Sequence, residues 1–314
     1  MSAQMQGNGR WSQPVFRWYD ESRLVPPELE TLLPPGAAPS RQERLQAIWR
    51  ELDSLTGLQE VKDLVRELYA FMEVRQRRQV LGLSVEPLAL HMIFYGNPGT
   101  GKTTVARILG KLLREMEILS KGHLVEVERA DLVGEYIGHT AQKTREQIRR
   151  ALDGILFIDE AYSLARGGEK DFGKEAIDTL VRAMENHREH LVAILAGYPD
   201  EMEFFLHTNP GLRSRFPIQI RFPDYRPEEL LEIAQGMVEE RQYRFALGAR
   251  EYLAALLRRP ELAPQIRHGN ARWVRNLVEK AIRRQALRVV REGRFHMEAL
   301  MTLLAEDLRQ ALEP

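Results

Sequence analysis

The sequence predicts an α/β domain with a five-stranded parallel sheet between helices, followed by a small all-helical domain. Five short apolar runs alternate with stretches of helical periodicity, which is typical of parallel strands joined by helical crossovers. Two of the runs, ILFI and VAIL, are apolar without alternation, as strands buried on both faces should be. After FPDYRPEE (222–229) the strand signals stop and only helical periodicity follows.

The chain begins with a different kind of segment. Residues 1–40 carry six prolines and no sustained periodicity, which predicts an extended or disordered arm. Its aromatic cluster either forms a docking peptide or packs on the arm's own domain; the cluster is Trp11, Phe16, Trp18 and Tyr19. From Arg41 the pattern becomes helical. We therefore expect an arm over 1–40, an α/β domain over 41–225 and a smaller helical domain over 226–314.

The strands are expected at the five apolar runs of the central region. Helical stretches between consecutive runs supply the crossovers that parallel pairing requires. The runs are LALHMIFY (88–95), HLVEVE (123–128), ILFID (155–159), LVAILA (191–196) and IQIRF (218–222).

Composition excludes several classes of function. Lys+Arg and Asp+Glu both total 45, so net charge provides no general attraction to nucleic acid or anionic lipid. Without cysteine, the chain can form no disulfide, thiol nucleophile or Cys-liganded zinc site. No run of 18 apolar residues exists, and MSAQMQGNGRWSQP lacks the pattern of a signal peptide. We therefore expect a cytoplasmic protein without a membrane partner.

A phosphate-binding loop directly follows the first predicted strand. GNPGTGKT (96–103) matches G-x-x-x-x-G-K-[ST] and opens an amphipathic helix. Its glycines let backbone N–H groups converge on phosphates, Lys102 supplies a positive charge, and the Thr103 hydroxyl suits Mg²⁺. The sequence thus predicts an ATP site at Gly96, Asn97, Pro98, Gly99, Thr100, Gly101, Lys102, Thr103 and Thr104.

Two carboxylates follow the third predicted strand. Asp159 and Glu160 come directly after four apolar residues, so we expect them at the carboxyl edge of the sheet, beside the phosphate loop. There Asp159 would hold the Mg²⁺ shell and Glu160 would act as general base on the attacking water. A base at this place favours hydrolysis of ATP over transfer of its phosphoryl group.

Arginines in two later segments are candidates to complete this site. NPGLRSRF (209–216) carries Arg213 and Arg215, either as surface ion pairs or with Arg215 as an arginine finger that reaches a neighbouring subunit. In GNARWVR (269–275), Arg272 could touch the γ-phosphate from the helical domain. The eight arginines of 265–294 suggest DNA, but most fall on the polar face of an amphipathic helix, which favours a solvated or subunit-contacting face.

These motifs, in this order, resemble those of the AAA+ ATPases, over residues 41–310. Within them the chain resembles the CbbX/stage V sporulation protein K family. The matching segments are GNPGTGKTTVAR, SKGHLVEVERADLVGEYIGHTAQKT, GILFIDEAYSLARGGEKDFGKEAIDTLV, LAGYPDEM and NPGLRSRFP.

The resemblance implies a homo-oligomeric ring, usually a hexamer, with ATP at subunit interfaces. It further implies Arg215 as the finger, Arg272 as a sensor in the lid, and Gly57 and Leu58 beside the adenine. One departure concerns the end of the fourth strand, where many AAA+ proteins carry a polar sensor and this chain has Ala196-Gly197-Tyr198. The resemblance therefore does not assign the group that orients the water beside Glu160.

The segment LVGEYIGHT follows the second predicted strand. Tyr136, Ile137 and Gly138 resemble a pore loop that grips a substrate polypeptide, with the tyrosine as contact surface and the glycine for mobility. GGEKDFG (167–173) resembles a second pore loop. The alternative is that Tyr136 belongs to the core, although no apolar periodicity surrounds it.

The motifs and the resemblance together lead us to expect an ATPase that remodels an unidentified protein client. The resemblance further implies that it forms a ring, acts through a central pore and serves sporulation. Two other classes stay open: a motor or loader that acts on nucleic acid, and a slow nucleotide-dependent switch or scaffold. The absence of net positive charge and the aromatic pore loop count against the nucleic-acid class.

Overall fold

The computed structural model describes residues 39–86, 89–136, 138–166 and 172–313. Several sequence-based expectations fall wholly or partly outside these ranges, among them residue 88 of the first predicted strand and residue 314 of the helical domain. Others bear on function. They concern the arm over 1–40 with its aromatic cluster, the pore-loop residue Ile137, and positions 167–171 of the second predicted pore loop.

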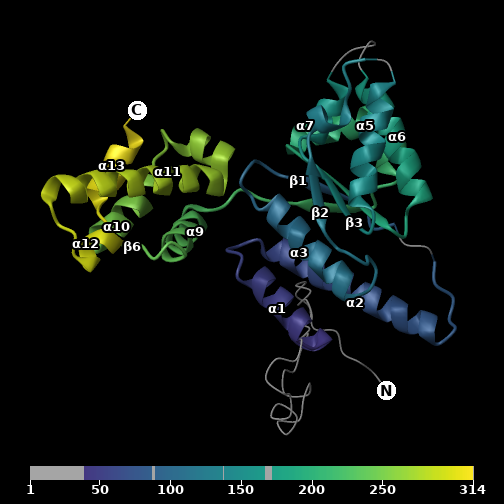
Figure 1. Ribbon diagram of the computed structural model, residues 1–314, viewed down its shortest axis with the longest axis horizontal. Helices are drawn as coiled ribbons and strands as arrows, with labels where there is room; N and C mark the ends of the chain where they lie inside the picture. The colour runs from purple at the N-terminus through teal and green to yellow at the C-terminus, as the bar shows by residue number, and fades with distance from the viewer. Residues whose placement is uncertain (1–38, 87–88, 137, 167–171, 314) are drawn as a thin grey trace, which may run out of the picture. The chain divides into compact units, whose positions relative to one another are not determined.

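Within the described ranges, five strands form one parallel sheet in the order β2-β3-β4-β1-β5. In Figure 1 the sheet lies among helices. The predicted strands agree with the observed ones to within one residue at nine of their ten ends, and the first strand begins four residues later than expected. The strands are β1 (Met92–Tyr95), β2 (Leu124–Val127), β3 (Gly154–Ile158), β4 (Leu191–Gly197) and β5 (Ile218–Arg221).

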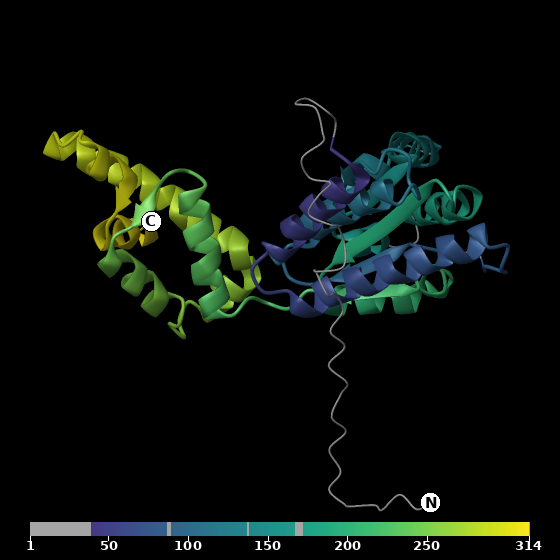
Figure 2. The same ribbon diagram turned by 90° about the horizontal axis from the view of Figure 1, so that it is seen from below.

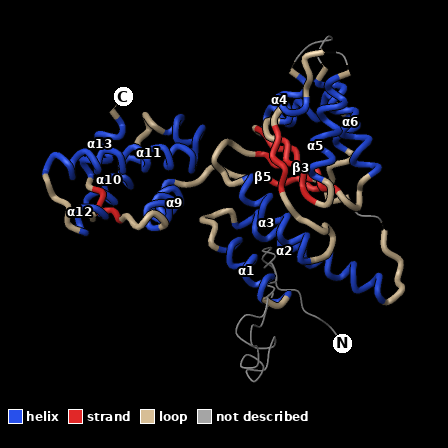
Figure 3. The backbone as a smooth tube through the Cα atoms, in the orientation of Figure 1, coloured by secondary structure: helices blue, strands red, loops and turns tan. Residues whose placement is uncertain are grey.

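Helices cover both faces of the sheet, as its apolar strands require. The helices α1–α3 pack on one face and α4–α8 lie on the other side (Figure 3). Their bounds are α1 (Arg41–Asp53), α2 (Gln59–Val80), α3 (Lys102–Glu115), α4 (Arg129–Leu132), α5 (His139–Ala151), α6 (Gly173–Asn186), α7 (Pro199–Thr208) and α8 (Pro210–Arg213), with a 3-10 helix, η2, at Ala161–Ala165.

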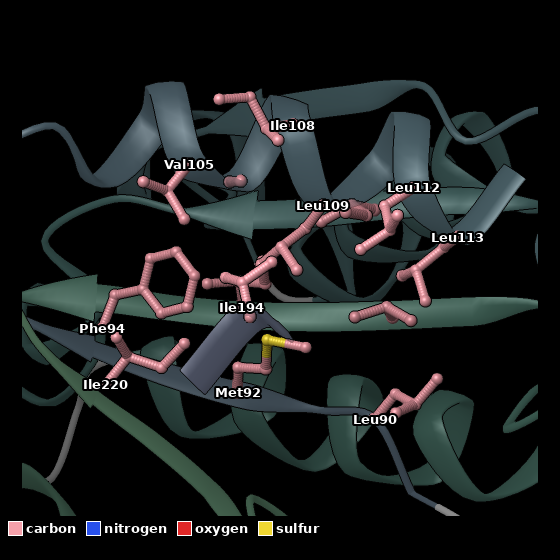
Figure 4. Close-up of a cluster of buried hydrophobic side chains, with 14 of the residues drawn as sticks. Leu90, Met92, Phe94, Val105, Ile108, Leu109, Leu112, Leu113, Ile194 and Ile220 are labelled. Atoms are coloured by element: carbon pink, nitrogen blue, oxygen red, sulfur yellow. The ribbon is translucent and has the colours of Figure 1, made fainter. Parts of the chain in front are cut away.

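The core divides between the two faces because neighbouring side chains of a strand point in opposite directions. Met92 and Phe94 of β1 join the cluster under α3, whereas Ile93 and Tyr95 join the cluster on the other face. The apolar face of α3 contributes four leucine and isoleucine side chains that lie over the strands in Figure 4: Ile108, Leu109, Leu112 and Leu113. Packing of α3 on β1 thereby fixes both ends of the phosphate loop that joins them.

The C-terminal segment is helical and has its own core. An extended link leads from β5 to α9 (Figure 2). The segment differs from the expected all-helical one by a parallel pair of two-residue strands, which are too short to leave an alternating signal. Its elements are α9 (Pro227–Glu239), β6 (Arg244–Phe245), α10 (Leu247–Leu256), α11 (Ala263–Glu292), α12 (Met297–Met301), β7 (Thr302–Leu303) and α13 (Ala305–Leu312).

One arginine of the basic 265–294 stretch is not solvated. Arg288 of α11 is buried and makes a two-pronged ion pair with Asp307 of α13, with Nε–Oδ1 and Nη2–Oδ2 distances of 2.9 and 3.0 Å. This pair ties α11 to α13, so Arg288 serves the packing of the helical segment. In the part of the chain that the structure describes, no helix has the length and apolar character to cross a membrane.

Candidate active site

The ends of three parallel strands bring the predicted site residues to one edge of the sheet. Gly96 follows β1, Asp159 follows β3 and Tyr198 follows β4. The strand β4 lies between β1 and β3, and the Gly96 N–H donates to the Gly197 carbonyl at 3.1 Å. Because β4 separates β1 from β3, the end of β4 lies between the phosphate loop and the strand that carries the two carboxylates. Tyr198 occupies the strand end between them.

The phosphate loop depends on glycine at several positions. Gly99 and Gly101 have φ angles of 73° and 96°, a conformation in which other residues are strained. At Gly96 a side chain would not fit, because a Cβ there would lie 2.6 Å from the Phe222 carbonyl oxygen. The Lys102 ammonium is buried and donates to the carbonyls of Gly96 and Asn97 at 2.7 and 2.8 Å. The loop thus holds a positive charge at the start of α3.

Three charged groups act on this ammonium. Burial lowers the pKa of Lys102 to about 8; Arg272 acts in the same direction, while Asp159 and Glu160 act against it. These interactions bring together side chains from the phosphate loop, the end of β3 and α11. Of the predicted catalytic residues, the structure therefore groups Lys102, Asp159, Glu160 and Arg272.

Glu160 has an unusual backbone conformation. Its φ and ψ are both 45°, in the left-handed region that non-glycine residues seldom adopt, and it caps the 3-10 helix η2. Its N–H donates to the Asp159 Oδ1 at 3.0 Å, and its side chain is exposed. Strained residues cluster at functional sites, so this conformation supports a chemical role for the Glu160 carboxylate.

Oxygen donors suited to Mg²⁺ lie at the same edge. The Thr103 hydroxyl, in the first turn of α3, donates to Glu126 Oε1 of β2 at 3.3 Å, and the Asp159 carboxylate is half-buried after β3. Mg²⁺ prefers oxygen ligands and is usually held by one or two protein groups together with water and substrate phosphates. A hydroxyl and a carboxylate beside a phosphate loop fit such an ion.

Tyr198 takes part in a row of rings that runs from η2 to α11. Its ring centroid lies 6.0 Å from that of Tyr162, and it stacks on His268 with centroids 5.9 Å apart and an interplanar angle of 13°. Burial raises the pKa of Tyr198, and the nearby Glu160 carboxylate raises it further. The Tyr198 hydroxyl therefore keeps its proton at neutral pH and can donate a hydrogen bond.

Arg215 lies at the opposite edge of the sheet. It precedes β5, whose first residue, Ile218, pairs with Met92 at the start of β1, whereas the phosphate loop follows the end of β1. Within its own chain the guanidinium bonds to Glu185 of α6 and donates to the Gly211 carbonyl at 2.7 Å. The structure thus does not group Arg215 with the phosphate loop of the same chain.

The segment before α2 borders the phosphate loop. A Cβ built on Gly101 would lie 3.3 Å from Leu58 Cδ1 and 3.2 Å from the Tyr225 hydroxyl oxygen. Gly57 and Leu58 both have positive φ, and the buried Leu58 is the N-cap residue directly before α2. Leu58 and the ring of Tyr225 therefore supply apolar surface next to the loop, as a site for a nucleotide base requires.

Tyr136 is an exposed aromatic residue. It lies between α4 and α5, the residue is 66% accessible, and its ring meets His139 edge-on with centroids 5.5 Å apart. Gly138 has a φ of 81°, and nothing lies within 4 Å of the position that a Cβ would take. The alternative that Tyr136 belongs to the core is therefore wrong.

Several residues of this region had no clear signal in the sequence. Glu185, which holds Arg215, lies in an ordinary amphipathic helix, and His268 precedes the GNAR motif without resembling a site residue. Asp224 and Tyr225 stand in the FPDYRP link, where proline indicates a boundary but no function. Their place near the site becomes visible only through contacts between residues that are far apart in the sequence.

A phosphate loop with a buried ammonium, a hydroxyl beside a carboxylate, and a strained acidic pair on a parallel sheet define a P-loop nucleoside triphosphatase. Comparison with family models agrees with this class. Residues 92–224 match the model described as "ATPase family associated with various cellular activities (AAA)", and residues 226–314 match the AAA lid domain.

Characterised relatives specify the family further. Stage V sporulation protein K of Bacillus subtilis is 55% identical over 268 residues, which cover 84% of this chain and 82% of that protein. Protein CbbX of Cereibacter sphaeroides is 49% identical over 83% of this chain and 85% of its own length. The chloroplastic ribulose bisphosphate carboxylase/oxygenase activase of Cyanidioschyzon merolae is 46% identical over 85% of this chain and 92% of its own length.

A solved structure supports the fold. A RuvB variant of Thermotoga maritima superimposes with a TM-score of 0.54 at 20% identity, covering 83% of this chain and 71% of RuvB. The chain belongs to the AAA+ ATPases, within the family of stage V sporulation protein K and CbbX, and is a nucleotide-binding ATP hydrolase.

Proposed function

We propose that this ATPase assembles into a homo-oligomeric ring, a hexamer, and uses ATP turnover to pull on a protein client through a central pore. The exposure of Tyr136 carries the proposal. The residue is 66% accessible and lies two positions before a glycine of positive φ, so its flat ring is free to contact a polypeptide of any sequence.

The positions of Arg215 and the phosphate loop support a ring. An arginine at the amino edge of the sheet is separated from its own phosphate loop by the length of β1. In a ring, a second copy of the chain can present the amino ends of its strands to the carboxyl ends of the strands in the first copy. Arg215 of the second copy then meets the phosphate loop of the first. Arg215 then stabilises charge on the γ-phosphate of its neighbour, with Glu185 holding the guanidinium until the subunits meet.

We assign the remaining roles around the phosphates as follows. Residues 96–104 hold the phosphates, and Gly57 and Leu58 border the adenine. Thr103 and Asp159 would hold Mg²⁺, which would supply charge neutralisation at the phosphate oxygens. Glu160 takes a proton from the attacking water, and Arg272 contacts the γ-phosphate from the lid. In this scheme residues 41–225 form the nucleotide-binding domain and 226–314 the lid.

The names of relatives support a protein client. One relative is an activase of ribulose bisphosphate carboxylase/oxygenase, which is itself a protein, and another is a sporulation protein. We therefore place the client of this chain in sporulation and favour a polypeptide over a nucleic acid as the ligand of the pore.

The variant Tyr136→Ala tests this proposal. Because the side chain is exposed, its loss should leave melting, nucleotide binding and assembly unchanged and basal ATP turnover within about threefold of wild type. Binding of fluorescently labelled unfolded casein, measured by anisotropy with ATP on a Glu160→Gln background, should fall about tenfold or more, as removal of an aromatic anchor implies.

Two controls accompany this measurement. Tyr136→Phe keeps the ring and should retain binding, and Phe71→Ala removes another exposed aromatic, on α2, and should change nothing. If wild type and Tyr136→Ala bound casein equally well, Tyr136 would not be the residue that contacts the client. Stimulation of ATP turnover by DNA but not by polypeptide would instead favour a nucleic-acid motor.

We further propose that Tyr198 is the polar group at the end of β4 that orients the water beside Glu160. Its hydroxyl is protonated and lies near that carboxylate. Tyr198→Phe keeps the stack on His268 and removes only the hydroxyl, so kcat should fall about tenfold while ATP affinity stays the same, as expected for one lost hydrogen bond. The matched variant Tyr243→Phe, on the lid, should keep wild-type kcat. If kcat were unchanged in Tyr198→Phe, a group other than Tyr198 would have to orient the attacking water.

A further inference from the structure

One carboxylate oxygen joins the phosphate loop to the lid. Asn97 Nδ2 of the loop donates to Asp224 Oδ1 at 2.9 Å, and Asn270 Nδ2 of α11 donates to the same oxygen, also at 2.9 Å. Asp224 itself lies in the link between β5 and α9. We call these three side chains, Asn97, Asp224 and Asn270, the polar latch.

Asn270 is buried and held in a strained conformation. It is 1% exposed, and its φ of 44° and ψ of −127° interrupt α11. Its Oδ1 accepts from the Tyr225 N–H at 3.0 Å, and its Nδ2 also donates to the Arg267 carbonyl at 2.7 Å. Because all its amide hydrogen-bonding groups have partners, these contacts impose the backbone conformation on a residue that would otherwise avoid it.

The interruption at Asn270 brings the next turn of α11 against the phosphate loop. The Ala271 N–H donates to the Gly99 carbonyl at 3.2 Å, and a Cβ on Gly99 would lie 2.7 Å from the Arg272 backbone nitrogen. The contact is so close that only glycine fits at position 99. Arg272 lies two residues after Asn270, so the direction of the Arg272 side chain depends on the backbone conformation of Asn270.

We propose that Asp224 and Asn270 are positioning residues for ATP hydrolysis, which hold the lid on the phosphate loop through Asn97 and set the lifetime of the bound nucleotide. The loop N–H groups bind phosphate, so a movement of the loop on nucleotide release also moves Asn97. The shared oxygen transmits this movement to Asn270 and to the helix that carries Arg272. The dependence on Arg272 rests on its proposed role, whereas the effect on nucleotide lifetime does not.

Exchange of the amide and the carboxylate tests the latch. Asn270→Asp tolerates positive φ and keeps the acceptor for Tyr225, but it places a second carboxylate beside Asp224. Asp224→Asn replaces a charged acceptor by a neutral and weaker one at an exposed position. In the double variant the new amide can donate to the new carboxylate and still accept from Asn97, so the connection between loop and lid returns with donor and acceptor exchanged. The bond to the Arg267 carbonyl is lost in Asn270→Asp and in the double variant alike, so it does not contribute to the rescue.

The measurement is the release rate of mant-ADP by stopped-flow fluorescence, together with kcat and KM for ATP and the melting temperature. Asn270→Asp should speed release about tenfold, and Asp224→Asn severalfold, as expected for loss of a charge-assisted hydrogen bond. The double variant should return to within about threefold of wild type, because the two changes are coupled. Asn276→Asp adds the same charge at an exposed position of α11 and should leave release unchanged.

Two results would overturn the inference. One is a wild-type release rate in both single variants. The other is a double variant that releases mant-ADP as fast as the faster of the two single variants and also has a lowered melting temperature. A purely structural role predicts this outcome, because the two substitutions would then not restore each other's effect on release. The release rate needs neither a client nor the pore, so failure of the latch and failure of the proposed remodelling activity are distinguishable.

Discussion

Arg215→Ala should lower ATP turnover about 10³-fold, the usual size of an arginine-finger effect, while nucleotide binding stays near wild type. In the proposed ring the lost guanidinium would act on a neighbour's γ-phosphate, and within its own chain Arg215 bonds to Glu185 and Gly211 rather than to the phosphate loop. Folding should hardly change, since the partner Glu185 is exposed and can be solvated. Turnover and mant-nucleotide affinity, measured on the same preparation, check this result.

Mixing experiments separate action on a neighbour from action within one chain. Lys102→Ala removes the ammonium from the phosphate loop and should abolish ATP binding in its own subunit. Rings that mix Lys102→Ala with Arg215→Ala contain interfaces that pair an intact loop with an intact finger, so partial activity should return. Arg213→Ala, in the same segment, serves as control and should keep turnover within about threefold. No rescue in rings proven to be mixed would mean that Arg215 does not act between subunits.

Glu160→Gln should lower turnover about 10²- to 10⁴-fold, the range for loss of a general base, without loss of ATP binding. Glutamine has nearly the same size and backbone preferences, so it should accept the left-handed conformation at position 160 as well as glutamate does. With ATP, the variant should form a more persistent oligomer than wild type, since the bound nucleotide is not consumed.

Turnover and sedimentation with ATP check the Glu160→Gln result. Glu203→Gln makes the same chemical change in an exposed carboxylate of α7 and should leave both readouts at wild-type values. If Glu160→Gln turned over within about threefold of wild type, another group would have to be the base.

The sequence alone determined the parts of this protein whose signals are local or periodic. GNPGTGKT can be recognised within eight residues, because glycines, a lysine and a threonine at fixed spacing predict a phosphate loop. The continuous apolar runs predicted buried parallel strands, and with them the placement of Gly96 and Asp159 at one edge of the sheet, since all parallel strands end on the same side. The family follows from these same motifs.

Only the tertiary structure decided the strand order and the contacts that depend on it. The insertion of β4 between β1 and β3 places Tyr198 between phosphate loop and carboxylates, and nothing in the local sequence of these strands encodes that neighbourhood. The latch joins residues separated by 127 and 46 positions in the chain, and the strain at Asn270 comes from partners on other elements. Such features depend on long-range packing, which a short-range pattern of residue types does not specify.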